Sequence, residues 1–279
     1  MAFVIGAGLR TQACGYACLI MHARRILLTG VRGTVAPALA LELQARGFET
    51  LAWDRALAPP EDAAAAMRTI AGSGAMAVVH CAMGDPAWAE RMAACCAARE
   101  IRFLYTSSVS VFGAQQRGPF EVDAVPEPSD DYGRYKLECE RRVLAAFPGA
   151  QVVRLGWQMS LQPGGNQMAE HLARQQSERG HVAASTGWFQ ACSFLEDTAR
   201  VLAEALGRFP PGLYQLDGNP GWDFHRVASA LNRAAGAGWT VRPADAPRLN
   251  NLMRDRRLPS ASIERLLEPH EACESPRPA

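Results

Sequence analysis

From residue 24 onward, short apolar runs alternate with longer segments in which apolar residues recur every three or four positions. The runs RRILLTG and AMAVVHCA are mostly apolar in the middle, as in strands that are buried on both faces. Strands are expected at 24–30, 48–54, 75–82, 101–108 and 150–157, and helices at 34–47, 61–74, 86–100 and 129–147. This alternation predicts an α/β fold, a doubly wound parallel sheet with helices on both faces.

The regular alternation ends at Trp157, which predicts a division of the chain. Residues 24–157 are expected to form the sheet domain. Residues 158–265 are expected to form mostly a smaller lobe, with some elements returning to the sheet domain. Residues 266–279 read as a flexible tail. Residues 1–23 fit neither a signal peptide nor a helix, so we predict a dispensable extension with the natural start at Met21.

Composition narrows the class of protein. The chain has 279 residues, 48% hydrophobic and 20% charged, with a net charge of +1, which is typical of a soluble globular protein. This balance gives no reason to expect nucleic acid or a membrane as a partner. The eight cysteines show no recurring pair spacing, so no metal is expected, and a reducing cytoplasm is the expected location.

A glycine turn follows the first strand. Gly30 and Gly33 lead from a buried strand into a helix, with Ala36 at the next position of the pattern. Glycine also ends strands for purely local reasons. Here, however, a strand precedes, a helix follows, and Asp54 ends the second strand, the context of a dinucleotide-binding turn.

The acidic and basic residues near this turn indicate different cofactors. Asp54 would suit the free ribose 2′-hydroxyl of NAD. Arg32 and Arg55 lie where guanidinium groups could hold the 2′-phosphate of NADP. The choice between NAD and NADP therefore stays open from the sequence.

Lys136 is the only lysine in the chain, and Tyr132 stands four residues before it. Residues at i and i+4 share a helix face, so the ammonium and the phenol can enter one site. A nearby ammonium lowers the pKa of a phenol and suits it to proton transfer. The alternative is a chance pairing on a surface helix. A serine-rich segment, TSSVSVFG, leaves the carboxyl end of a central strand, where it is either a capped turn or part of a ligand site.

Together these motifs resemble the extended short-chain dehydrogenase/reductase family over residues 24 to about 265. The matching segments are TGVRGTVA, SSVSVFG and YGRYK. The segments GPFEVDAVPEPSDDYGRYKLECER, VVRLGW and RDRRLP look closest to the dTDP-4-dehydrorhamnose reductase branch. The chain departs from that branch in VHCAMG, where the branch has Asn-Ala-Ala, in Val109, where it has an acidic residue, and in a short segment 56–74.

The resemblance implies a Rossmann fold with a small C-terminal substrate-binding lobe, and an NADPH- or NADH-dependent oxidoreductase that reduces a ketone. The catalytic set it implies is Ser108, Tyr132 and Lys136, with Lys136 anchoring the nicotinamide ribose and keeping Tyr132 acidic, and Tyr135 structural. Cofactor contacts are expected from Gly30, Arg32, Gly33, Thr34, Val35, Asp54, Arg55, His80, Cys81, Ala82, Tyr132 and Lys136. Substrate contacts are expected from Ser110, Trp157, Asn166, Gln167 and Trp188.

Several alternatives remain open at this level. The substrate ketone is a nucleotide-linked keto-sugar or a secondary-metabolite intermediate. The family also contains NAD(P)-dependent sugar-nucleotide epimerases and non-catalytic NADP-binding regulatory subunits. Arg154 either faces the substrate or is paired internally, and His80 either touches the cofactor or fills the core. A homodimer through helices 86–99 and 130–147 is what the family suggests.

Overall fold

The computed structural model describes residues 24–114, 117–161, 167–259 and 262–264. Their centre is a parallel sheet with the spatial order β2-β1-β3-β4-β6-β11. Its strands are β1 (Arg25–Thr29), β2 (Glu49–Ala52), β3 (Ala75–His80), β4 (Arg102–Ser108), β6 (Gln151–Leu155) and β11 (Gly212–Leu216). The predicted doubly wound α/β fold is confirmed. The predicted extension 1–23 and the tail 266–279 lie outside the described residues.

The order in which strands are added to the sheet reverses at β1, which has β2 on one side and β3 on the other. The chain goes from β1 outward to β2, crosses back through one helix, and adds β3 on the other side of β1. The short segment 56–74 accounts for this path, because it holds a single helix and leaves β2 at the sheet edge. Ligands of open α/β sheets bind outside the carboxyl ends of the strands at such a reversal.

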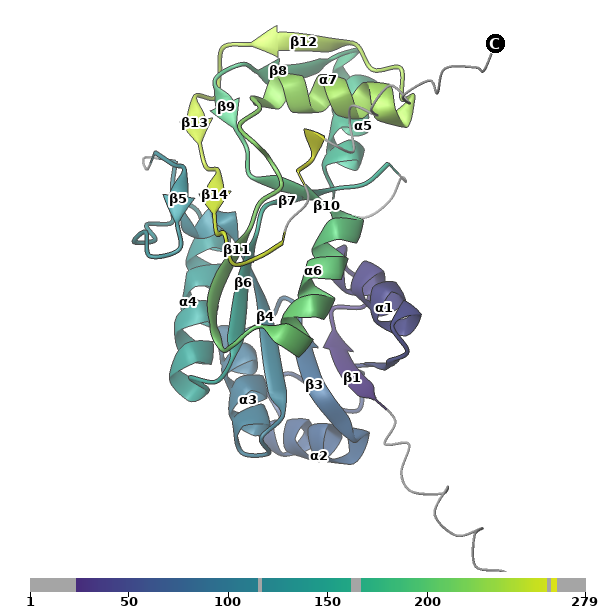
Figure 1. The fold of residues 1–279 in the computed structure, drawn as a ribbon, viewed down its shortest axis with the longest axis vertical. Coiled ribbons are helices and arrows are strands. Elements are labelled where there is room, and N and C mark those ends of the chain that lie inside the picture. Colours follow the sequence, from purple (N-terminus) through teal and green to yellow (C-terminus); the bar gives the residue numbers. More distant parts are fainter. Residues whose placement is uncertain (1–23, 115–116, 162–166, 260–261, 265–279) are drawn as a thin grey trace, which may run out of the picture.

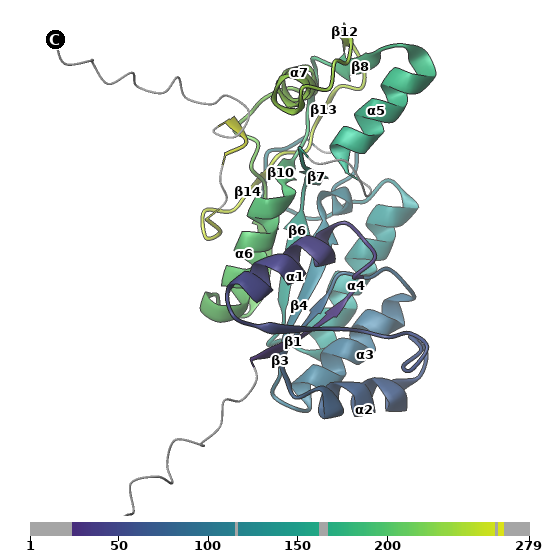
Figure 2. The ribbon, with the colours of Figure 1, turned by 90° about the vertical axis from the view of Figure 1, so that its right-hand side faces the viewer.

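Helices cover both faces of the sheet (Figures 1 and 2). One face carries α2 (Ala63–Ser73), α3 (Pro86–Ala97) and α4 (Asp131–Ala146), and the other carries α1 (Val35–Ala45) and α6 (Leu195–Arg208). Polar caps fix where three of them begin: Asp62, Asp85 and Asp130 each accept a hydrogen bond from a backbone N–H of the first helical turn.

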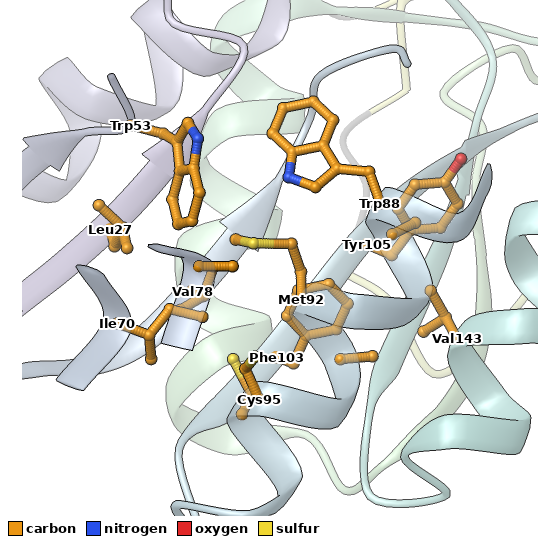
Figure 3. Packing of buried hydrophobic residues seen from close by; sticks show 14 of the residues in the cluster. Leu27, Trp53, Ile70, Val78, Trp88, Met92, Cys95, Phe103, Tyr105 and Val143 are labelled. Atoms are coloured by element: carbon orange, nitrogen blue, oxygen red, sulfur yellow. The ribbon is translucent and has the colours of Figure 1, made fainter. Parts of the chain in front are cut away.

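Large side chains fill the space under α2 and α3. Trp88 and Tyr105 are fully buried there, with Trp53 and Met92 beside them (Figure 3). The indoles of Trp53 and Trp88 have centroids 6.2 Å apart and are tilted by 58°. Burying one such aromatic side chain contributes about 1.5–3 kcal/mol, so this cluster holds the carboxyl ends of β2 and β3 in a fixed relation.

A buried ion pair connects α4 to β6. The Arg154 guanidinium donates from Nε to Glu140 Oε1 at 2.9 Å and from a terminal nitrogen to Oε2 at 2.8 Å. The two side chains are 3% and 4% exposed. Arg154 is therefore paired inside the protein, which resolves the alternative left open by the sequence.

The C-terminal lobe is built from short strands around a second apolar core. Its elements are β7 (Trp157–Met159), α5 (Met168–Arg179), β8 (Val182–Ser185), β9 (Trp188–Phe189), β10 (Cys192–Phe194), α7 (Phe224–Ala235), β12 (Val241–Ala244) and β13 (Leu249–Asn250). The pairs β10–β7, β12–β8 and β13–β9 are all parallel, so each joins segments distant in sequence. A further pair joins β5 (Phe120–Glu121) to β14 (Met253–Arg254).

Residues after 157 do not all belong to this lobe. Figure 1 shows the lobe stacked above the carboxyl ends of the sheet, while α6 and β11 return to the sheet domain. In the part of the chain that is described, no helix has the length and apolar character needed to cross a membrane.

Candidate active site

A cleft of about 1500 Å³ lies between the carboxyl ends of the sheet strands and the lobe. It brings together most of the residues that the sequence singled out: Gly30, Arg32, Gly33, Thr34, Val35, Asp54, Arg55, Cys81, Ala82, Ser108, Ser110, Tyr132, Lys136, Trp157 and Trp188. These residues come from seven separate segments, and they meet because parallel strands end at the same edge of the sheet.

Two of the predicted contacts that the structure describes, Gln167 and His80, do not line the cleft. Gln167 is buried at the start of α5 and does not line the cleft. Asn166 lies outside the described residues. His80 is 1% exposed and packs against Trp88, with ring centroids 4.6 Å apart. His80 therefore fills the core, the second of the two alternatives left open by the sequence.

Hydrogen bonds define the protonation of His80. Thr29 Oγ1 accepts from the backbone N–H groups of Cys81 and Ala82, both at 3.1 Å. Its own proton is then free to be donated to His80 Nδ1, 2.9 Å away, which makes His80 a neutral acceptor. Burial, with the charges of Lys136 and Arg55, lowers the pKa of His80 to about 3. Through Thr29 this network fixes the β3 end beside the glycine turn.

The glycine turn packs directly on that network. Gly30 has φ +76°, and a Cβ added to it would lie 2.9 Å from the Ala82 nitrogen. The turn is closed by a hydrogen bond from Gly33 N to the Gly30 carbonyl at 2.8 Å. The first turn of α1 carries no acidic residue, so an anion at this helix N-terminus would meet backbone N–H groups and no opposing charge.

Asp54 and Arg55 stand at the end of β2, at the same end of the cleft. Asp54 Oδ1 accepts a hydrogen bond from Ala56 N at 2.8 Å. The Arg55 guanidinium donates to the Met83 carbonyl at 2.6 Å and lies 4.7 Å above the Trp88 ring. Arg55 is thus held against the cleft wall by a carbonyl and a ring face, and none of the described carboxylates pairs with it.

Lys136 is buried in the cleft wall, between the part that contains the glycine turn and the part that faces the lobe. Its side chain is 3% exposed, and Nζ donates to the Thr106 carbonyl at 2.8 Å. Nζ also lies 4.9 Å from the centroid of the Tyr105 ring and 5.8 Å from that of Tyr132. Burial lowers the pKa of Lys136 to about 8, against a smaller opposing effect of Cys139 and other acidic groups.

Tyr132 and Ser108 face each other across the cleft floor. Gly133 makes this possible, because any Cβ at that position would overlap the Ser110 carbonyl oxygen and push α4 away. Partial burial raises the pKa of Tyr132, and its hydrogen bond with the Ser108 hydroxyl lowers it in part. Ser108 Oγ also accepts from Ser110 N at 3.1 Å, which orients the hydroxyl at the end of β4.

The electrostatic expectation for Tyr132 needs a correction. We predicted that Lys136 keeps Tyr132 acidic, yet the pKa of Tyr132 is raised, and Lys136 is not among the causes of its shift. The reason is geometric: the ammonium is directed to the Thr106 carbonyl. Tyr135 lies outside the cleft lining, and its hydroxyl accepts a hydrogen bond from Gly84 N at 3.1 Å.

The lobe contributes residues that sequence reasoning missed. Gln158, Gln190 and Asn251 line the cleft beside Trp157 and Trp188. Gln158 follows a predicted residue directly and was within reach of the sequence argument. The other two are brought in by the pairing of the two-residue strands β9 and β13, which no periodicity reveals. Ser107, also missed, lines the cleft with a buried hydroxyl that has no partner in the described structure.

A protein-family model described as "RmlD substrate binding domain" matches residues 24–248. Among curated proteins, the chain is 35% identical over 158 residues to a dTDP-4-dehydrorhamnose reductase of Mycolicibacterium smegmatis, covering 50% of this chain and 48% of the relative. It is 30% identical over 155 residues to methionine adenosyltransferase 2 subunit beta of Xenopus tropicalis, covering 47% and 46%. The chain thus spans about half the length of the curated relatives it matches.

A solved structure supports the fold. The dTDP-4-dehydrorhamnose reductase of Bacillus anthracis in complex with NADP superposes with a TM-score of 0.75 at 17% sequence identity, covering 88% of this chain and 97% of that one. At this level of identity the likeness concerns the arrangement of the sheet, helices and lobe.

Proposed function

Because the chain belongs to the RmlD substrate binding domain family, we propose that it is an NAD(P)H-dependent reductase that transfers a hydride to a ketone. The resemblance drawn from the motifs is confirmed by the family match. The observation that carries the proposal is the convergence of Ser108, Tyr132 and Lys136 on the cleft that also contains the Gly30 turn. A module that only binds a nucleotide would have no need for all three.

The glycine end of the cleft fits a dinucleotide. The space above Gly30 and Gly33, at the start of α1, suits a pyrophosphate, since the turn admits no side chain and the helix adds its dipole. Arg32 and Arg55 line this end together with Asp54. Two guanidinium groups against one carboxylate favour the additional 2′-phosphate, so we expect NADPH to bind more tightly than NADH. When bound, the cofactor supplies the hydride.

Tyr132 and Ser108, together with Lys136, would then act on the carbonyl oxygen of the substrate. Tyr132 donates its phenolic proton to the oxygen of the reduced carbonyl, and Ser108 donates a hydrogen bond to the same oxygen. Lys136, whose Nζ lies 5.8 Å from the centroid of the Tyr132 ring, would hold the ribose of the bound cofactor. The raised pKa of Tyr132 keeps the phenol protonated, as a proton donor requires.

A titration with NADPH and then NADH, followed by nicotinamide fluorescence, tests the cofactor part. Wild type is expected to bind NADPH more tightly, and Lys136→Arg to weaken both, because a planar fork does not fit a site with one carbonyl partner. Absence of binding of either nucleotide to folded wild type would refute the proposal.

Turnover is tested with a panel of ketones and the Tyr132→Phe variant. This variant is expected to lose about 100-fold or more in kcat, as on removal of a general acid, while keeping its affinity for NADPH. Tyr135→Phe is the matched control, because Tyr135 lies three residues away on the same helix and outside the cleft. Equal activity of the two variants would exclude Tyr132 as the proton donor and favour a non-catalytic role.

A further inference from the structure

Asp217 lies where the sheet domain meets the lobe, and it does not line the cleft. It directly follows β11, the edge strand of the sheet, which has β14 beside it (Figure 1). Its Oδ1 accepts from Cys192 N at 3.0 Å and from Asn219 N at 2.9 Å, and its Oδ2 accepts from Met253 N at 2.9 Å. One side chain thus connects the sheet to β10 and to β14, which are far apart in the sequence.

These three contacts require an ionised carboxylate, which carries acceptors on both oxygens and no donor. Asp197 and Asp255 each pair with an arginine, whereas Asp217 has no ion pair among the residues that the structure describes. Its charge is therefore held by backbone N–H groups, in hydrogen bonds that are stronger than neutral ones. Burial raises the pKa of Asp217 to about 7, and the three N–H groups oppose that rise.

The N–H groups that this carboxylate binds belong to segments that form the lobe side of the cleft. Cys192 stands two residues after Gln190 and is the partner of Trp157 in the β10–β7 pair. Met253 stands two residues after Asn251. Gln190, Trp157 and Asn251 all line the cleft. Two residues of extended chain span at most about 7 Å, so each bonded N–H is close to a lining residue.

A second polar side chain extends these contacts toward the cleft. Asn219, whose N–H binds Asp217, donates from Nδ2 to the carbonyls of Gln190 at 2.8 Å and Trp222 at 2.9 Å. Its Oδ1 accepts from Trp222 N at 2.7 Å, which fixes the orientation of the amide. The backbone of Gln190 is therefore held both by Asn219 and, two residues on, by the bond from Cys192 N to Asp217.

We propose that Asp217 is a positioning residue for the substrate, which acts by holding the segments of Gln190 and Asn251 at the cleft, a role that rests on the proposed reductase function. Without its charge, β10 and β14 lose their common attachment to the end of β11. Substrate affinity depends on this fixed arrangement, because an ordered site binds at a lower entropic cost. The glycine turn, Tyr132 and Ser108 are positioned by the sheet and α4, so cofactor binding and proton transfer are spared.

Asp217→Asn and Asp223→Asn are a matched pair of variants. Asn has one acceptor oxygen in place of two, so at position 217 its NH₂ group must oppose at least one of the three N–H groups. Asp223 is also a partly buried aspartate of the lobe, and it caps α7 by accepting from Arg226 N at 2.8 Å. Its loss destabilises the lobe and leaves the three bonds of Asp217 in place. If Asp217→Asn does not fold, Asp217→Ser replaces it, since a hydroxyl can still accept from Asn219 N.

Hydrogen–deuterium exchange of the ligand-free protein at pH 8.5, where Asp217 carries its charge, tests the structural step. Asp217→Asn is expected to speed exchange tenfold or more in the peptides that contain Cys192 and Met253, as on loss of a hydrogen bond to a charged group. Asp223→Asn is expected to speed exchange at the start of α7 and to leave those two peptides unchanged. Unchanged exchange at both Cys192 and Met253 in Asp217→Asn overturns the inference.

Steady-state kinetics at the same pH, with NADPH and dTDP-4-keto-6-deoxy-D-glucose as the ketone, test the functional step. Asp217→Asn is expected to raise KM for the ketone about tenfold, and to change kcat and the affinity for NADPH less than about twofold. A protein that is only destabilised, as expected for Asp223→Asn, loses kcat at an unchanged KM. That result in Asp217→Asn overturns the inference. If folded wild type does not reduce this ketone, the proposed function fails for it, and the exchange measurement alone decides the role of Asp217.

Discussion

Lys136→Met isolates the energetic cost of burying the only lysine of the chain. The pKa of Lys136 is about 8 in the folded protein against an ordinary value of 10.5. At 1.36 kcal/mol for each pH unit, this difference means that the charged ammonium destabilises the folded state by about 3 kcal/mol below pH 8. Between pH 8 and 10.5 the unfolded chain holds the proton and the folded chain does not, so wild-type stability rises with pH.

The assay is urea unfolding of wild type and Lys136→Met at pH 7, 8, 9 and 10.5. The free energy of unfolding of the variant, minus that of wild type, is expected to fall by about 3 kcal/mol over this range. Loss of the hydrogen bond to the Thr106 carbonyl contributes a constant offset, and other titrating groups are common to both proteins. A difference that stays constant with pH would refute a lowered pKa for Lys136.

Three further outcomes are expected. Gly30→Ala should abolish NADPH binding and lower Tm more than Gly47→Ala, because both glycines have φ near +77° but only Gly30 is crowded by backbone; equal Tm shifts would contradict this. Glu140→Gln should lower the free energy of unfolding by about 3–5 kcal/mol by leaving Arg154 buried and unpaired, and Glu140→Leu/Arg154→Met should recover most of it in the same urea assay. His80, neutral with a pKa of about 3, should make wild-type stability fall as pH drops from 6.5 to 3, by up to about 5 kcal/mol, and His80→Gln should lack that slope.

The sheet could be predicted because its strands are buried on both faces and its helices on one. Apolar runs of seven or eight residues and helical spacing are local signals, and they placed β1, β3 and β4 within a residue or two of their ends. The lobe could not be predicted in this way. Strands as short as β9 and β13 have no period of their own, and each exists because its partner, some 60 residues away, completes it.

The residues of the candidate site also fall into those that local sequence signals reveal and those that they do not. Gly30 and Lys136 could be found from the sequence, because a turn and an i, i+4 pair are set by neighbouring residues. Asn251 and Gln190 could not, because their place in the cleft depends on how the lobe closes. The proton affinity of Tyr132 was predicted wrongly for a similar reason: spacing places a charge nearby, but burial and the direction of the ammonium decide the sign.

The placement of cations explains why one lysine remains among so many arginines. Arg154 is as deeply buried as Lys136, and its permanent charge meets a bidentate carboxylate from Glu140. Lys136 meets a single carbonyl and the faces of tyrosine rings, with no carboxylate bonded to it in the described structure. An arginine there would be a buried cation that cannot release its proton, whereas a lysine with a pKa near 8 can neutralise and later bind a ribose. The position therefore requires an amine whose charge is conditional, which only lysine provides.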